Sequence, residues 1–69
     1  MQTKQEAARR AIAQLGGLTK AAKALRIENV RIVSNWPKRG VSIRHVLDVE
    51  KETGIPRHEL RPDIFEAAQ

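Results

Sequence analysis

Residues 18–36 constrain the fold more than any other part of the chain, and they read LTKAAKALRIENVRIVSNW. Apolar residues recur in the first half at the spacing of one helix face, and they do so again in the second half. Residues 26–28 fall between the halves and are expected to form a tight turn. The pattern predicts two short helices with a structural core of Leu18, Ala22, Leu25, Val33 and Trp36.

The second helix of this pair carries polar side chains on the face opposite Val33. An arginine can bind guanine through two hydrogen bonds, an asparagine can bind adenine in the same way, and a valine can contact a thymine methyl group. A helix with such a face and an apolar back is suited to the major groove of DNA. The expected base-reading residues are Asn29, Val30, Arg31, Ser34 and Asn35.

Basic and small polar residues flank the helix pair, and they are expected to bind DNA phosphates. Such contacts fix the position of a protein on the duplex without reading its sequence. The N-termini of helices that open at Thr19 and Ser42 would add backbone amides for the same purpose. The expected phosphate-binding residues are Thr19, Lys20, Lys38, Arg39 and Ser42.

Local residues predict how the helix pair begins and turns. Thr19 is expected to cap the first helix, with Leu18 packed just before it, and Asn29 is expected to cap the second. Ile27 is expected to lie under the turn. Trp36 shares a helix face with Val33, so it is interpreted as a core residue rather than as a stacking platform for bases.

The rest of the chain also predicts helices, because no stretch alternates between apolar and polar residues for long enough to form a sheet. Pro37 disfavours helix at the residue before it, so the second helix of the pair is expected to end at Trp36, with residues 38–40 as an exposed basic turn. Further helices are expected over residues 4–15, 42–54 and 56–60. The apolar positions of the helix that begins at Ser42 are expected to be Ile43, Val46, Leu47 and Val49. The predicted fold class is all-α, a compact bundle of about five short helices.

Charge is distributed unevenly along the chain. Residues 1–45 contain ten Lys or Arg and two acidic residues, whereas residues 46–69 contain three basic and six acidic residues. A basic region that includes the helix pair is typical of a protein that binds a polyanion. The alternative is a domain with an incidental excess of basic residues.

Length and composition limit the class of protein. The 69 residues suffice for one domain, 1–69, with a C-terminal tail over residues 61–69. Cysteine is absent, and no apolar run reaches the roughly 18 residues of a membrane span, so we expect a cytoplasmic protein without a membrane partner. A core this small is often stabilised by a second subunit.

The chemistry of an enzyme is not visible in the sequence. His45 and His58 lack the spacing of metal ligands, and neither Ser34 nor Ser42 has a base and an orienting acid beside it. The phosphate-binding pattern GxxxxGK[ST] is also missing. We therefore expect no catalytic residue, no metal and no cofactor.

Residues 17–40, which end in VSNWPKRG, resemble the small Cro-type phage repressors and, more closely, the YdaS-like antitoxin and transcriptional regulator family. Residues 57–65, RHELRPDIF, are similar to the closing signature of that family, and residues 40–54 resemble its fourth helix. The resemblance covers about residues 11–65. It implies a lambda-repressor-like helix-turn-helix fold that binds double-stranded operator DNA, as a homodimer on a palindrome, in a bacterial or phage-infected cell.

Two departures from the pattern of that family concern the turn. Arg26 stands where these motifs usually have a glycine, and the stretch from Leu25 to Val33 is one residue longer than is typical. Either the turn is wider or the helix after it starts differently. The contacts of Asn29 and Val30 therefore depend most on the geometry of this turn.

Two functions are consistent with these patterns. The first is a Cro-like repressor that binds a specific operator as a dimer. The second is an antitoxin that binds a toxin protein through its acidic C-terminal third and that also represses its own operon. The two roles are compatible with each other.

Overall fold

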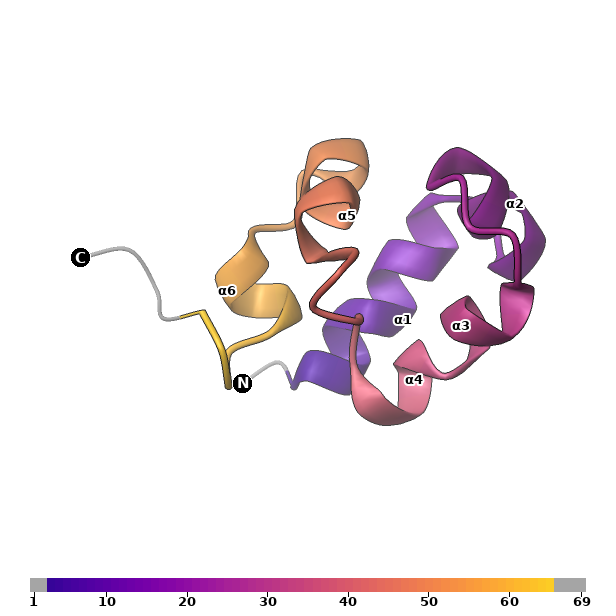
Figure 1. Cartoon of the computed structure of the whole chain (residues 1–69). Helices are drawn as coiled ribbons and strands as arrows, with labels where there is room; N and C mark the ends of the chain where they lie inside the picture. The colour runs from indigo at the N-terminus through magenta and orange to yellow at the C-terminus, as the bar shows by residue number, and fades with distance from the viewer. Residues whose placement is uncertain (1–2, 66–69) are drawn as a thin grey trace.

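The computed structural model describes residues 3–65, which fold into helices without any strand. Figure 1 shows the helices in chain order, with α1 running through the middle of the molecule. Their bounds are α1 (Lys4–Gln14), α2 (Leu18–Ala24), α3 (Val30–Ser34), α4 (Trp36–Arg39), α5 (Val46–Thr53) and α6 (Arg57–Leu60). The predicted all-α class is confirmed. Residues 1–2 and 66–69 lie outside the described residues.

Helix α1 is the element around which the other helices pack. It begins at Thr3, whose hydroxyl accepts a hydrogen bond from the backbone N–H of Glu6 at 3.1 Å. Its inner face consists mainly of alanine, which allows α4 and α6 to approach its backbone closely. The buried residues of α1 are Ala7, Ala8, Ala11 and Ile12.

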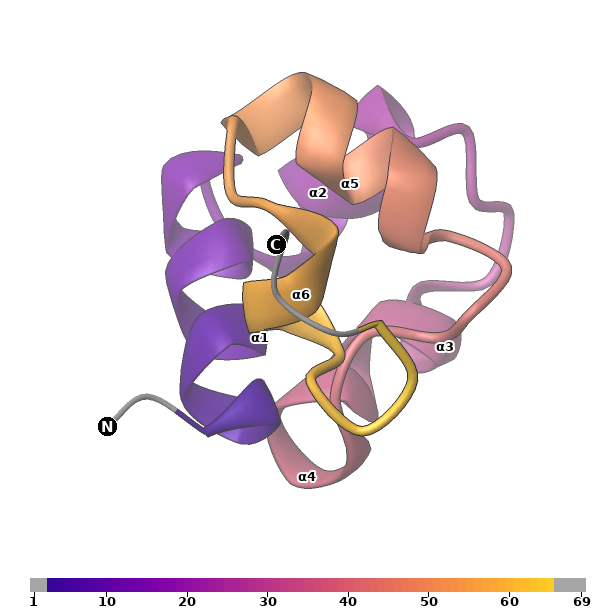
Figure 2. The ribbon, with the colours of Figure 1, turned by 90° about the vertical axis from the view of Figure 1, so that its left-hand side faces the viewer.

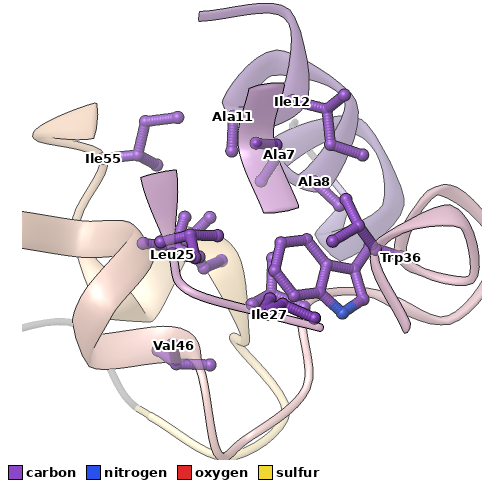
Figure 3. Packing of buried hydrophobic residues seen from close by; sticks show 14 of the residues in the cluster. Ala7, Ala8, Ala11, Ile12, Leu25, Ile27, Trp36, Val46 and Ile55 are labelled. Atoms are coloured by element: carbon purple, nitrogen blue, oxygen red, sulfur yellow. The ribbon is translucent and has the colours of Figure 1, made fainter. Parts of the chain in front are cut away.

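The core forms where α1 meets the helices that follow it. Trp36 is 1% exposed and Leu60 is fully buried, and these are the two largest of the side chains that the fold buries almost completely. Figure 3 shows the Trp36 ring pointing into the cluster that also contains Ala8 and Ile27. The indole N–H of Trp36 donates a hydrogen bond to the hydroxyl of Ser42 at 3.1 Å, so this buried donor is satisfied.

The predicted helix start at Ser42 was wrong, and the hydrogen bond from Trp36 explains why. The Ser42 hydroxyl is directed to the tryptophan rather than to a helix N-terminus, and α5 begins only at Val46, after a turn. Of the four predicted apolar positions, Val46 and Val49 are fully buried in α5. Ile43 and Leu47 are 57% and 55% exposed, so they do not belong to the core.

Arg61 attaches the C-terminal segment to the rest of the fold. Its guanidinium donates to the backbone carbonyl of Val41 at 2.8 Å and to both carboxylate oxygens of Asp63, at 3.0 and 2.9 Å. Lys4 of α1 lies 3.5 Å from the same carboxylate. Phe65 packs partly against the core, while Ile64 stays 41% exposed. The Arg-Pro-Asp part of the tail is thus a structural connection between the two ends of the described chain.

The ion pair of Arg61 and Asp63 predicts a loss of stability in acid. Hydrogen bonds from Arg61 hold the pKa of Asp63 well below its ordinary value of 3.8, although partial burial opposes the shift. A lowered folded-state pKa contributes stability that is present above about pH 4 and is lost as the pH falls below that value. Between pH 5 and pH 2, we expect the Tm of the native chain to fall by roughly 2–4 °C more than the Tm of Asp63→Asn.

Circular dichroism melts across this pH range measure the difference. Glu28→Gln is the matched control, because Glu28 is exposed, forms no ion pair within residues 3–65, and its loss should leave the acid dependence unchanged. Parallel acid curves for the native chain and Asp63→Asn would show that the pair contributes nothing to folding.

The turn after α2 contains a residue in an unusual backbone conformation. Arg26 has a φ of 57°, and it is the one residue other than glycine with a positive φ among the described residues. The backbone N–H groups of Arg26 and Ile27 donate to the carbonyls of Lys23 and Ala22, at 3.2 and 2.8 Å. This arrangement is the Schellman ending of a helix, whose left-handed position usually holds glycine. The departure noted at Arg26 is therefore a strained version of the usual turn.

Replacing Arg26 by glycine should stabilise the fold by about 0.5–1 kcal/mol, because glycine adopts a positive φ without steric cost. Arg26→Ala is the matched control, since it removes the same charge but keeps a Cβ atom at the strained position. Urea unfolding of both variants separates the two effects. A glycine variant no more stable than the alanine variant would mean that the turn carries no strain.

Candidate DNA-binding site

Helices α2 and α3 lie together at the end of the molecule away from α6, and α4 follows α3 along the lower side in Figure 1. Helix α3 contacts both α2 and α4, so it lies between them in the packing. Figure 2 shows the opposite end, where α5 and α6 are nearest to the viewer. The candidate site is therefore one face of a short helix that two other short helices hold in place.

The start of α3 follows the sequence prediction. Asn29 has an extended backbone, and its side-chain oxygen accepts the backbone N–H of Arg31 at 2.9 Å, which makes it the N-cap. Ile27, 8% exposed, lies under the turn as predicted. The stretch from Leu25 to Val33, one residue longer than is typical, thus consists of a Schellman turn followed by the capped start of α3.

Two buried residues fix the orientation of α3. Val33 is fully buried and Trp36 is 1% exposed, and both were predicted as core. Ala22 and Leu25 of the preceding segment, also predicted as core, are 6% and 7% exposed. With Val33 directed inward, the opposite side of a helix of this length must face solvent.

The five residues predicted to read bases are all exposed: Asn29, Val30, Arg31, Ser34 and Asn35. Within residues 3–65, the side chains of Arg31 and Asn35 make no hydrogen bond or ion pair, so their donors and acceptors are available. The Ser34 hydroxyl donates to the carbonyl of Arg31 at 2.9 Å and keeps its acceptor positions free. The oxygen of Asn29 is used by the cap, which leaves its amide N–H groups to donate.

The beginning of α2 differs from the prediction. Gly17, with a φ of 108°, is the N-cap, and Leu18 is the first helical residue. Thr19 therefore does not cap the helix, and Leu18 is 39% exposed, so its assignment to the core was wrong. The cause is the end of α1, where Gly16 and Gly17 both have positive φ and reverse the chain directly into α2. Thr19 and Lys20 remain exposed on the first turn of α2.

The segment after α3 also differs from the prediction. Helix α3 ends at Ser34, and Trp36 begins the one-turn helix α4 rather than ending α3. Proline fits the first turn of a helix, where its missing N–H would have no partner, and the carbonyl of Asn35 accepts the N–H groups of Lys38 and Arg39. Lys38 and Arg39 are thus exposed on a helix rather than in a turn.

Unpaired positive charge surrounds α3. The carboxylates that form ion pairs within residues 3–65 are Glu50, Glu59 and Asp63, which all lie in α5, α6 or the segment after α6. Between residues 18 and 40, the described chain has basic residues and a single acidic one, Glu28, and none of them forms an ion pair. These basic residues are Lys20, Lys23, Arg26, Arg31, Lys38 and Arg39. Because no internal carboxylate neutralises them, they are available to an anionic partner.

One residue of α3 is exposed without a predicted role, and one predicted contact loses its basis. Ile32 on α3 is 37% exposed. It directly precedes buried Val33, so the helical spacing places it beside the buried face and not within it. Ser42 is half-buried and bonded to Trp36, and no helix begins there, so the expected helix N-terminus for phosphate binding at this residue was wrong. The DNA-contacting roles of the remaining residues stay predictions.

A metal-binding cluster and a membrane-spanning helix are both absent from the described part of the chain. Residues 3–65 contain no group of three or more His, Asp or Glu placed to hold a metal ion. No helix in the same range has the length and apolar character needed to cross a bilayer.

Comparison with known proteins agrees with this arrangement. Residues 8–69, which include the whole of α2 to α6, match a protein family described as bacterial toxin YdaS. The chain belongs to this family. No curated protein sequence matches the chain. Among solved structures, the Cro protein from the prophage element Xfaso 1 in Xylella fastidiosa strain Ann-1 is 34% identical, with a TM-score of 0.78 over 88% of this chain and 97% of that one.

The resemblance inferred from residues 17–40 and 57–65 is thereby confirmed. The YdaS-family chain has the fold of a Cro protein, and its α2 and α3 are the two helices predicted from the sequence. The description of the family names a toxin, whereas the resemblance implied an antitoxin.

Proposed function

We propose that this YdaS-family chain is a sequence-specific DNA-binding regulator of the Cro type, which places α3 in the major groove of an operator. The observation that carries the proposal is the outer face of α3. There, Arg31 and Asn35 are exposed and unpartnered within residues 3–65, while Val33 on the same helix is fully buried. The proposed role is not enzymatic, and it is carried out in the bacterial cytoplasm.

The surroundings of α3 support binding to a duplex. Lys20 on α2 and Lys38 and Arg39 on α4 are exposed, and these two helices contact α3. Lysine and arginine beside a recognition helix bind phosphates and release counterions, which makes the affinity depend on salt. The 34% identity to a Cro protein supports the same assignment.

We further propose that the regulator acts as a repressor and binds a palindromic operator as a homodimer. Two copies related by a two-fold axis would present their α3 helices to successive turns of the major groove, about 34–36 Å apart. A palindromic site is then read twice by the same residues.

Titration of fluorescent DNA from beside its own gene, against scrambled DNA of equal length and at matched salt, tests the proposal. We expect the specific site to bind at least about 1,000-fold more tightly than the scrambled DNA. Equal affinities for the two DNAs at every salt concentration would contradict a regulatory role through sequence reading.

A second candidate, a role in toxin–antitoxin activity, is favoured by the description of the family. In this role the C-terminal third would bind a toxin partner. Several of its charges are already paired within the chain, since Glu50 pairs with Arg57 and Arg61 with Asp63. The exposed large apolar residues of this third are Leu47 and Ile64, and Ile64 lies in the segment after α6.

Co-expression with the product of the neighbouring gene tests this second role. Ile64→Glu is preferable to deletion of residues 57–69, because the deletion would also remove fully buried Leu60. We expect the substitution to abolish co-purification of the partner and to leave DNA binding intact. If no neighbouring product alters growth or co-purifies with the native chain, the toxin–antitoxin role is excluded.

A further inference from the structure

The turn before α5 and the first turns of α5 carry an apolar surface that the fold does not cover. Ile43 is 57% exposed and Leu47 is 55% exposed, and no other large apolar side chain among residues 3–65 is more than 41% exposed. Helix α5 runs along the upper, outer side of the molecule in Figure 2. Neither side chain belongs to the face of α3 described above.

The two residues lie on one side of a continuous helical path. The N–H of His45 donates to the carbonyl of Ser42, and the N–H of Val49 donates to the carbonyl of His45, so the turn leads directly into α5. Residues four apart on such a path adjoin on its surface. Val46 and Val49 are fully buried on the other side, which directs Ile43 and Leu47 outward together.

Two residues of opposite charge, also four positions apart, directly follow the two apolar residues in the sequence. Arg44 follows Ile43, and Asp48 follows Leu47, and both charged residues are exposed. Neither forms an ion pair within residues 3–65. We call the surface formed by Ile43, Arg44, Leu47 and Asp48 the α5 surface. One end of it is apolar and basic, and the other end is apolar and acidic.

We infer that the α5 surface binds a second copy of this chain, with the two α5 helices antiparallel about a two-fold axis. In this arrangement Ile43 packs against the partner's Leu47, and Arg44 faces the partner's Asp48. Each contact occurs twice, because a two-fold interface uses the same patch on both subunits. A parallel arrangement would instead place Arg44 against the partner's Arg44.

The α5 surface is better suited to a second copy than to nucleic acid. Asp48 and the neighbouring Glu52 are exposed and would repel phosphates. Two aliphatic side chains per subunit form a small contact, in the class of interfaces below about 1,200 Å² that give weak, reversible association. The inference rests on the proposed dimer and names its surface, which is separate from the face of α3.

Sedimentation equilibrium of the full chain without DNA tests the inference. We expect a monomer–dimer equilibrium with a dissociation constant in the micromolar range. Leu47→Glu should raise this constant at least about tenfold, because each subunit would place one carboxylate in the apolar interface. Leu18→Glu is the matched control, since Leu18 is 39% exposed on α2, and it should leave the equilibrium unchanged. Circular dichroism confirms that both variants are folded.

Charge exchange tests the antiparallel arrangement. Arg44→Asp and Asp48→Arg should each weaken the dimer up to about tenfold, because the symmetry converts two attractive pairs into two repulsive ones. The double variant should associate within about twofold of the native chain. A double variant as weak as the single ones, a native chain that stays monomeric at millimolar concentration, or a Leu47→Glu variant that dimerises normally would overturn the inference.

Binding to a single half-site separates this inference from the proposed function. We expect Leu47→Glu to bind a half-site like the native chain and to lose only the added affinity for two half-sites. If the native chain prefers no DNA sequence, the proposed function fails while sedimentation still decides the α5 surface. If Leu47→Glu dimerises normally and the operator is still bound specifically, the inference alone fails.

Discussion

Trp36→Ala is expected to leave most of the chain unfolded at 25 °C. The side chain is 1% exposed, and it is the largest residue of the core. Truncation of a buried tryptophan to alanine costs about 3–5 kcal/mol, whereas a domain of this size has a total stability of about 5 kcal/mol. The loss should also remove the order of α3 and α4, because Trp36 is the first residue of α4 and packs in the core beside Val33.

Thermal unfolding followed by circular dichroism measures this effect, and two milder variants separate its parts. Trp36→Phe keeps most of the apolar bulk and removes the hydrogen bond to Ser42, while Ser42→Ala leaves the indole N–H without its acceptor. We expect each to cost about 1–2 kcal/mol, with a double variant that costs less than their sum. A cooperative transition of Trp36→Ala near that of the native chain would show that the ring does not hold the site together.

Arg31→Ala is expected to reduce the preference for the operator over DNA altered at one base pair by roughly 5- to 150-fold. The physical reason is the loss of a two-donor contact to guanine, which contributes about 1–3 kcal/mol of discrimination. The guanidinium of Arg31 is exposed and unpaired within residues 3–65, so its removal should not disturb folding.

Lys38→Ala is the matched control for Arg31→Ala, because both changes remove one exposed positive charge. Lys38 lies on α4, and we expect its loss to weaken binding to all sequences alike and to reduce the salt slope by about one unit. Competition binding with operator and single-base variants at several salt concentrations distinguishes the two results. Equal losses on every sequence from Arg31→Ala would remove Arg31 from the residues that read bases.

The parts of the fold that local patterns decide were predictable from the sequence. Asn29 caps α3 because an asparagine before an apolar repeat can accept a backbone N–H within two residues. Val33 and Trp36 share a helical spacing and are both buried. Such features depend on neighbours in the sequence, which is why the helix pair and its inner face could be predicted.

The parts that were wrong depend on side-chain contacts between neighbouring elements or on adjoining turns. Ser42 has the properties of a helix cap, but the indole of Trp36 binds its hydroxyl. The N-cap of α2 is Gly17, two residues before the predicted Thr19, because the turn of Gly16 and Gly17 leads straight into α2. The apolar spacing of a single helix reveals neither how the core packs around Trp36 nor how one turn leads into the next helix.

The α5 surface shows another limit of the periodic pattern. Ile43 and Leu47 follow the same apolar spacing as Val46 and Val49, yet only the valines are buried. The pattern indicates that a residue prefers an apolar environment, and it does not say whether the chain itself or a second molecule provides it.

An NMR titration of the labelled chain with operator DNA, and with scrambled DNA of equal length, shows whether the outer face of α3 reads bases. We expect the side-chain signals of Val30, Arg31, Ser34 and Asn35 to shift most with the operator and much less with scrambled DNA, while the signals of α6 remain unchanged. Shifts that are largest outside α2, α3 and α4, with the side chains of α3 unperturbed by the operator, would contradict base reading by α3.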